Sequence, residues 1–296
     1  RGRRFGAWNL SLALLSFLLV LFGTYATRSG AIQSVHAYTL SGVGGVYLSF
    51  LALAALLTVT GCSAPAESGS VKTWIVATDA AFPPMEFVDE NKNIAGFDID
   101  LLNAIADVQG FQVKFENTAW DGIFAGLESG DYDAIMSAVT INDERTPVYD
   151  FSDPYVNAGQ AVVVRADEAA ITGGDDLVGK TAGAQIGTTG AFTIQDIEGT
   201  TLKEYDSIDL ALLDLVNGNL DAVVVDTPVA ADFALASDQF AGKLKIVGDT
   251  LTDEYYGLLV RKGENADLLA SFNEGLQKVK DNGTYDQIYA KWISGN

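Results

Sequence analysis

A single arginine, Arg145, stands in an acidic, turn-rich stretch, AVTINDERTPVYDFSDPY (138–155), directly after an apolar run. A cation is unusual in this chain, which has 18 Lys and Arg residues against 39 Asp and Glu residues. A guanidinium is planar and donates two parallel hydrogen bonds, which suits it to bind a carboxylate. We therefore predict that Arg145 binds the carboxylate of a ligand; the alternative is a solvated partner of Asp143 or Glu144.

Asp226 is a second charged residue whose place in the sequence suggests ligand chemistry. It follows four apolar residues, AVVV, at the point where a strand would emerge from the core. A ligand that carries a positive charge beside its carboxylate would need an anion as well as a cation. Asp226 could supply that anion. It could also cap a helix that begins near Pro228, and the two roles are compatible.

The composition excludes several other kinds of site. The chain has one cysteine, Cys62, and one histidine, His36, both outside the acidic part of the sequence. Internal disulfides, a Cys/His zinc site and a His-based triad in the globular region are therefore excluded. The net charge of −21 includes +4 from the first 61 residues, so residues 62–296 carry −25. Because this charge repels nucleic acid, we expect no DNA or RNA partner. Since the globular part, beyond Cys62, has no cysteine or histidine for chemistry, we expect a binding protein without cofactor or metal rather than a hydrolase.

Two apolar runs dominate residues 1–61, which we interpret as a hydrophobic membrane or signal region. The run 9–26 is uncharged and long enough to span a bilayer. The run 46–60 is shorter and ends in VTGCSAPAESGS, which resembles a bacterial lipoprotein signal. That resemblance implies cleavage before Cys62, a lipid on its thiol and a polar linker over 62–72. The alternative is an ordinary buried cysteine in a membrane helix.

A second resemblance covers roughly residues 5–50. The stretch GTYATRSGAIQSVHAY (23–38) is similar to part of the multispan haem lyase of cytochrome c maturation, and His36 matches a histidine that handles haem in that family. The matching piece is small, so we expect no haem binding and interpret the segment as a possible fusion artefact. A genuine anchor with two spans is the alternative, although its N-terminal arginines would return the chain to the cytoplasm.

Beyond the linker, short apolar runs alternate with amphipathic segments. Asp98 and Gly110 are the predicted N-cap and stop of a helix. Such alternation is typical of a parallel, doubly wound α/β sheet. The first unit is predicted to contain strands at 73–79, 112–116 and 132–139 and helices at 98–110 and 121–130.

An internal repeat indicates a second unit of the same kind. LESGDYDAI (127–135) and LVNGNLDAV (215–223) share the pattern L-x-x-G-x-x-D-A-[IV], in which a helix ends at Gly and a strand starts at Asp. The two strands run on to Thr140 and to Asp226. Since ligands of open α/β sheets lie at the carboxyl ends of strands, we expect these two residues to face one cleft from different lobes.

The remaining elements complete two lobes. Lobe 1 is predicted to comprise 73–162 and 250–296, and lobe 2 to comprise 163–249. The chain would then cross between the lobes twice, which makes a hinge. The elements expected in this part are strands at 161–165, 180–185, 201–205, 244–248 and 255–261, and helices at about 265–281 and 284–294.

Six motifs, taken in order along residues 72–296, resemble the polar amino-acid-binding proteins of ABC importers. That family implies a two-lobed, type II periplasmic-binding-protein-like fold, which closes on an L-amino acid and delivers it to a membrane permease. It also implies a monomeric, extracytoplasmic protein. The motifs are VATDAAFPPMEF (76–87), GFDIDLLNAIA (96–106), TINDERTPVYDFSDPY (140–155), IGTTGAF (186–192), DAVVVDTP (221–228) and NGTYDQIYAKW (282–292).

The resemblance also implies roles for individual residues. The arginine that matches Arg145 binds the α-carboxylate in that family, and the aspartate that matches Asp226 binds the α-ammonium. GTTG (187–190) opens a helix whose free N–H groups suit a carboxylate. Phe82 and Trp120 would sandwich the ligand's side chain, unless they are core aromatics. The predicted ligand-binding residues are Asp79, Phe82, Trp120, Ser137, Ala138, Thr140, Arg145, Gln185, Thr188, Thr189 and Asp226.

Three positions bear on the side chain of the ligand. Val225 stands where glutamine binders of the family often have a histidine, and Gln185 where they have a lysine. Together with Asp79, these residues favour a neutral polar or basic side chain over glutamine. Two other functions stay open. They are an enzyme on the same fold, similar to cyclohexadienyl dehydratases, and the amino-acid sensor domain of a signalling receptor.

Overall fold

The computed structural model describes residues 20, 24 and 71–294. The chain divides into two units, Arg1–Ser70 and Val71–Asn296. In the first unit, Thr24 Oγ1 donates a hydrogen bond to the backbone oxygen of Val20 at 2.9 Å. The predictions for Cys62 and His36, including lipidation and the haem lyase fragment, lie outside the described residues. No helix in the described part of the chain is long and apolar enough to cross a membrane.

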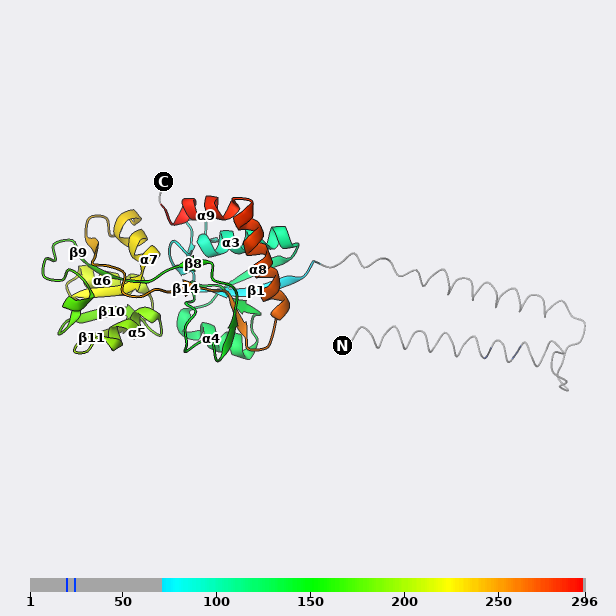
Figure 1. The fold of residues 1–296 in the computed structure, drawn as a ribbon, viewed down its shortest axis with the longest axis horizontal. Helices are drawn as coiled ribbons and strands as arrows, with labels where there is room; N and C mark the ends of the chain where they lie inside the picture. The colour runs from blue at the N-terminus through cyan, green and yellow to red at the C-terminus, as the bar shows by residue number, and fades with distance from the viewer. Residues whose placement is uncertain (1–19, 21–23, 25–70, 295–296) are drawn as a thin grey trace, which may run out of the picture. The chain divides into compact units, whose positions relative to one another are not determined.

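The second unit contains two five-stranded sheets with the same pattern of strand order (Figure 1). In each sheet the first three strands in the order are parallel, and the fourth runs antiparallel to both of its neighbours. The predicted parallel sheet is therefore confirmed except at the fourth strand. The first sheet has the order β5 (Gln112–Asn117), β1 (Thr73–Thr78), β6 (Ala134–Ile135), β15 (Leu259–Arg261), β7 (Tyr149–Phe151). The second has the order β11 (Thr201–Tyr205), β10 (Thr181–Gln185), β12 (Ala222–Asp226), β9 (Gln160–Arg165), β13 (Leu244–Val247).

The antiparallel strands arrive by two crossovers between the lobes. The short strands β8 (Val156–Asn157) and β14 (Tyr255–Tyr256) pair with each other and lie between the two sheets in Figure 1. β8 leads into β9 of the second sheet, whereas β14 leads into β15 of the first. The lobe boundary expected between residues 162 and 163 falls inside β9, all of which belongs to the second sheet. The first crossover therefore lies a few residues earlier than predicted.

Helices cover both faces of each sheet, as expected for a doubly wound fold. In the first lobe, α3 (Phe97–Gln109), α8 (Ala266–Asp281) and α9 (Thr284–Trp292) pack together, and α4 (Trp120–Ser129) lies on the opposite face. In the second lobe, α6 (Ile208–Val216) and α7 (Thr227–Ala231) lie opposite α5 (Thr189–Asp196). One apolar core continues through both lobes by way of Tyr155 and Tyr256 on the crossovers. The smaller elements are β2 (Ala81–Phe82), β3 (Glu86–Val88), β4 (Ile94–Ala95), η1 (Gly174–Leu177) and η2 (Asp232–Ala236).

The predicted N-cap of α3 is wrong. Gly96 occupies the capping position, and Asp98 lies one residue inside the helix. Asp98 is fully buried, and its Oδ2 accepts hydrogen bonds from the backbone N–H of Ala138 at 2.9 Å and from Tyr155 Oη at 2.7 Å. The predicted stop is confirmed. Gly110 adopts a left-handed conformation with φ 74°, which favours glycine, and its N–H donates to Ala106.

The internal repeat has a structural basis. Asp133 precedes β6 and accepts a hydrogen bond from the backbone N–H of Ile75 at 2.9 Å. Asp221 precedes β12 and accepts one from the backbone N–H of Thr181 at 2.8 Å. The repeated aspartate therefore links β6 to β1 in the first lobe and β12 to β10 in the second. The strand predicted at 132–139 is shorter than expected, because only Ala134–Ile135 pairs as β6.

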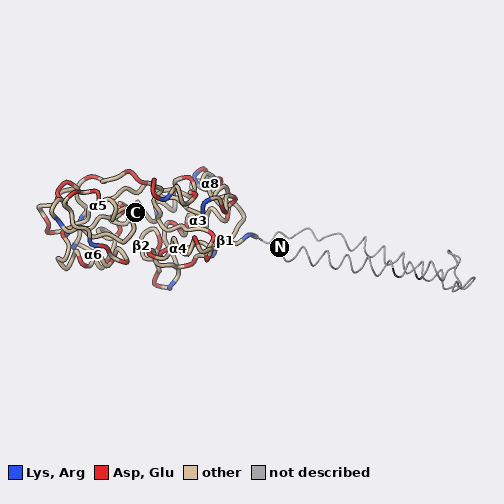
Figure 2. Tube along the Cα trace, turned by 90° about the horizontal axis from the view of Figure 1, so that it is seen from below, with Lys and Arg blue, Asp and Glu red and all other residues tan. Residues whose placement is uncertain are grey.

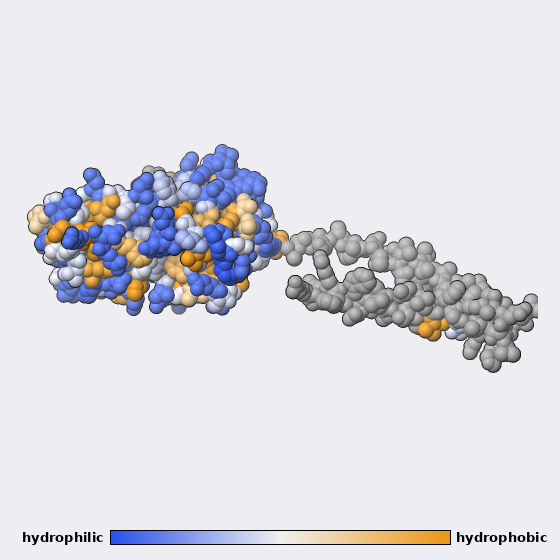
Figure 3. Space-filling view, turned by 60° about the horizontal axis from the view of Figure 1, so that its bottom comes forward, coloured by the Kyte–Doolittle hydropathy of each residue, from blue (hydrophilic) through white to orange (hydrophobic). Residues whose placement is uncertain are grey.

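The surface of the second unit reflects its composition. Acidic residues lie on both lobes and outnumber basic ones along the trace (Figure 2). On the face in Figure 3, apolar residues are interspersed among polar ones. Among the large apolar side chains of the described residues, Leu235 in η2 is the most exposed, at 81%.

Candidate ligand-binding site

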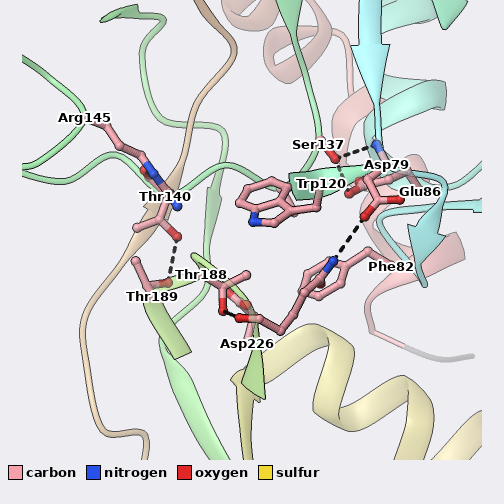
Figure 4. A pocket seen from close by; sticks show the side chains of 12 residues that line it. Asp79, Phe82, Glu86, Trp120, Ser137, Thr140, Arg145, Thr188, Thr189 and Asp226 are labelled. Carbon is pink, nitrogen blue, oxygen red and sulfur yellow. Dashed lines mark hydrogen bonds between the residues drawn. The ribbon is translucent and has the colours of Figure 1, made fainter. Parts of the chain in front are cut away.

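A cavity lies between the lobes, beyond the carboxyl ends of β1, β6, β10 and β12 (Figure 4). This is where an open α/β sheet binds its ligands. The residues that line it are Asp79, Phe82, Glu86, Trp120, Ser137, Ala138, Thr140, Arg145, Gln185, Thr188, Thr189 and Asp226.

All eleven residues predicted from the sequence are among these twelve. Seven come from the first lobe, and four (Gln185, Thr188, Thr189 and Asp226) come from the second. These residues meet at one cavity because most of them end a strand, closely follow a strand or begin a helix. The twelfth residue, Glu86, was not predicted.

Arg145 is the one cation among the described residues that line the cavity, and it is only 8% exposed. Its Nη1 donates to the backbone oxygen of Thr140 at 3.0 Å, and its Nη2 donates to that of Gly187, in the other lobe, at 3.3 Å. The guanidinium carbon lies 5.6 Å from the centre of the Trp120 ring. Burial lowers the pKa of the guanidinium, while the more distant carboxylates of Asp226, Glu254 and Glu144 act to raise it. Arg145 is thus held in place without an ion pair to any described carboxylate within 4 Å.

Asp226 ends β12 and is 5% exposed. It occupies the N-cap position of α7, but its side chain makes no capping hydrogen bond, so its carboxylate is available to the cavity. Oδ1 accepts a hydrogen bond from Gln160 Nε2 at 3.1 Å. Burial, followed by the nearby Glu254 carboxylate, raises the pKa of Asp226 to about 7. A cation at this place would favour the charged form.

Polar side chains from both lobes and from a crossover meet beside Asp226. Thr140 Oγ1 lies 3.3 Å from Thr189 Oγ1 and 3.1 Å from Glu254 Oε2, to which it donates. Gln160 Nε2 donates to Thr189 Oγ1 at 3.0 Å. Because Glu254 belongs to the segment that returns to the first lobe, this network joins the cavity to the crossover region.

The GTTG motif forms the start of α5, as predicted. Thr188 is the N-cap: its Oγ1 accepts from the backbone N–H of Ala191 at 3.4 Å and donates to the backbone oxygen of Gln185 at 2.7 Å. A capped helix start directs backbone N–H groups and a partial positive charge at the cavity. Both features suit an anionic group.

The far end of the cavity is acidic. In Figure 4, Asp79, Glu86 and Phe82 lie across Trp120 from Arg145 and Thr140. The backbone N–H of Asp79 donates to Ser137 Oγ at 2.9 Å, and that hydroxyl donates to Glu86 Oε1 at 3.0 Å. Across the lobes, Gln185 Nε2 donates to Asp79 Oδ2 at 3.1 Å. Burial raises the pKa of Asp79 and, more strongly, that of Glu86.

Three polar residues at or near the cavity were missed in the sequence. Glu86 stands between Met85 and Phe87, and an acid inside an apolar run is a signal that could have been used. Gln160 opens the valine-rich strand β9, which is a weaker signal. Nothing in the local sequence around Glu254 distinguishes it from its exposed acidic neighbours, because its partners come from distant segments.

Comparisons with known proteins agree with this architecture. The model of bacterial extracellular solute-binding proteins, family 3, matches residues 74–295. A probable histidine-binding protein of Neisseria gonorrhoeae is 36% identical over 236 residues, which cover 78% of this chain and 87% of that protein.

Solved structures are similar over the same part of the chain. An ancestral arginine-binding protein bound to arginine is 42% identical with a TM-score of 0.70, covering 75% of this chain and 98% of that one. An ancestral amino acid-binding protein, a precursor of cyclohexadienyl dehydratase, is 38% identical with a TM-score of 0.68, covering 75% of this chain and 95% of that one.

Proposed function

The chain belongs to the bacterial extracellular solute-binding proteins, family 3, and we propose that it captures a free polar or basic L-α-amino acid and delivers it to an ABC permease. The observation that carries this proposal is that Arg145 and Asp226 place opposite charges at one cavity. The two side chains come from different lobes, border one cavity, and form no ion pair with any described residue. They are the opposite charges that a zwitterion needs.

The α-carboxylate would bind at Arg145. Nη1 and Nη2 present a fork to one ligand group, and a charged acceptor makes shorter and stronger hydrogen bonds than the two carbonyls that Arg145 contacts. The hydroxyls of Thr140 and Thr189 and the N–H groups at the start of α5 are further donors. The α-ammonium would bind Asp226, whose buried carboxylate would then gain a countercharge.

Binding between the lobes explains why a ligand would close them. The hydrogen bonds that cross the cavity between described residues are few: Gln185 with Asp79, Thr189 with Thr140, and Arg145 with Gly187. A ligand that contacts both lobes adds bonds that exist only in the closed form, so it shifts the population toward closure. The crossovers at β8 and β14 are the proposed hinge.

The ligand's side chain would lie between Phe82 and Trp120 and point toward the acidic end. The relatives described above are named for binding histidine and arginine. Asp79 and Glu86 at that end, with no cation among the described residues beside them, support a polar or basic side chain.

A ligand screen tests the proposal. We expect isothermal titration calorimetry with the twenty L-amino acids to show tight binding of one or a few polar or basic ones, and no comparable binding of their D-enantiomers. Small-angle scattering should show compaction with the same ligands. Absence of binding by every amino acid would refute the proposal.

A dehydratase is the main alternative, because the amino acid-binding neighbour described above is a precursor of cyclohexadienyl dehydratase. An enzyme of this kind would need an acid or base poised over the substrate ring. Incubation with arogenate or prephenate, followed by assay for phenylalanine or phenylpyruvate, separates the two functions. We expect no product, and turnover would replace binding as the proposed function.

We also propose an extracytoplasmic protein held at the membrane by a lipid on Cys62. The support is the sequence alone, in which an apolar run ends in Gly-Cys and a polar linker follows. Mass spectrometry of the native N-terminus should find a lipid-modified Cys62, and Cys62→Ser should release the protein from membranes. Retention of the variant at the membrane would contradict lipid anchoring through this residue.

A further inference from the structure

Glu86, at the acidic end of the cavity, and the neighbouring Asp98, which does not line the cavity, are buried carboxyl groups that each have one oxygen without a hydrogen-bond partner among the described residues. Glu86, on β3, is fully buried, and its Oε1 accepts from Ser137 while its Oε2 has no partner among the described residues. Asp98, on α3, is also fully buried. Its Oδ2 accepts from Ala138 and Tyr155, whereas its Oδ1 has no such partner. Isolated polar atoms of this kind are costly, so each needs a partner.

The two carboxyl groups supply that partner to each other. The side chains of Glu86 and Asp98 are within hydrogen-bonding contact. Two carboxyl groups can bond in this way only when one of them carries a proton. Burial raises the pKa of both, and raises that of Asp98 to about 6. The pair therefore shares one proton and carries a single negative charge near neutral pH.

Among the described residues, the charged and titratable groups around this pair do not include a cation. Asp79 faces Glu86 from the end of β1, Tyr155 faces Asp98 from the first crossover, and Tyr256 approaches both from the second. The only cation among the described cavity residues, Arg145, lies at the opposite end (Figure 4). The acidic end thus lacks a countercharge.

We propose that Glu86 binds the cationic end of the ligand's side chain and that the Glu86–Asp98 pair releases its shared proton when this cation enters. The inference rests on the proposed function, since the head group must be held at Arg145 and Asp226 for the side chain to reach Glu86. The exchange is balanced: one positive charge enters, one O–H bond breaks, and the proton leaves to solvent.

Proton release makes the capture of a cationic ligand dependent on pH. Protons compete with the cation for the pair, so affinity for a cationic ligand falls as pH falls below the raised pKa at which the free pair takes up its shared proton. A neutral ligand of the same shape leaves the proton in place. Its affinity is lower, and it does not depend on the titration of the pair.

Calorimetry with arginine and citrulline tests this directly, because citrulline has the shape of arginine without the side-chain charge. Titrations at pH 6.5 in two buffers of different ionisation enthalpy measure proton release. We expect the intact protein to bind arginine at least about tenfold more tightly than citrulline, the lower bound for a charge-assisted contact. It should release up to one proton with arginine and none with citrulline.

Three variants localise the effect. Glu86→Gln should lose the preference for arginine and the proton release while still binding citrulline, which also shows that it folds. Asp98→Asn should keep the preference but lose the proton release, because the introduced amide can donate a hydrogen bond to an ionised Glu86. The exposed Glu90, next to β3, provides the matched control, and Glu90→Gln should change neither quantity.

The outcomes separate this inference from the proposed function. Equal affinity for arginine and citrulline in the intact protein, or unchanged arginine preference in Glu86→Gln, would overturn the inference alone. If the intact protein prefers arginine to citrulline but releases no proton on binding arginine, the proposed proton release is refuted. Binding of neither ligand, together with no hit among the twenty amino acids, would refute the proposed function as well.

Discussion

Arg145→Ala is the sharpest test of how this cavity works. The substitution removes a guanidinium that is 8% exposed and presents two nitrogens at the point where the lobes meet. Each charge-assisted hydrogen bond contributes about 1.5–3 kcal/mol, so losing two costs about 3–6 kcal/mol of binding. At 1.4 kcal/mol for each tenfold change, affinity for an amino acid should fall by about 10²- to 10⁴-fold.

The ligand-free fold should change little. Arg145 loses two hydrogen bonds to backbone carbonyls, but the cost of burying an unpaired guanidinium disappears with them. Arg145→Lys keeps the charge and loses the fork, so it should fall between the intact protein and Arg145→Ala. Calorimetry gives the affinities, and thermal unfolding without ligand gives the stability.

Arg165→Ala is the matched control. Arg165 is also partly buried and donates to two backbone oxygens, those of Leu215 at 3.3 Å and Leu220 at 2.7 Å, but it does not line the cavity. Its removal should lower stability and leave affinity nearly unchanged. The reasoning fails if Arg145→Ala binds as tightly as the intact protein, or if the control loses affinity to the same extent.

Three further predictions concern the second lobe. The pKa of Asp226 is about 7 in the fold against 3.8 without it, so the folded chain holds a proton that the unfolded chain has lost. Ligand-free stability should therefore rise as pH falls from about 7 toward 4. Asp226→Asn should flatten this dependence and raise the ligand-free melting temperature at pH 8 while weakening ligand binding; a lower melting temperature at pH 8 would contradict the assignment. Gly190→Ala should cost about 1–3 kcal/mol in denaturant unfolding, because a Cβ there would lie 2.7 Å from the backbone oxygen of Val224; unchanged stability would contradict it. Gln185→Leu removes the inter-lobe bond to Asp79, so small-angle scattering without ligand should show a more open protein, and no change in dimensions would mean that this bond does not hold the lobes together.

Much of the molecule could be predicted from local patterns. Gly110 and the GTTG motif identified helix ends because the backbone conformation or the cap depends on those residues themselves. The repeated Asp133 and Asp221 indicated two equivalent lobes, since each ties neighbouring strands in the same way. Thr140 and Asp226 were expected at the cavity because each follows the end of a strand, whereas residues such as Asp79, Phe82 and Trp120 were predicted from the family resemblance.

Other features depended on partners distant in the sequence. Asp98 has the residue type and position of an N-cap, yet its carboxyl group turns inward because Ala138, Tyr155 and Glu86 are brought to it by other elements. The strand order is a similar case. β9 and β15 run antiparallel because each enters its sheet from a crossover, which no local pattern encodes.

The sequence by itself determined the two-lobed α/β plan and the residues that carry the charges for a zwitterion, because strand ends, helix caps and an isolated arginine are local properties. Only the tertiary structure decided which acids share a buried environment. Glu86 and Asp98 are ordinary acids in the sequence; they become a proton-sharing pair because folding removes water from both and leaves no cation beside them.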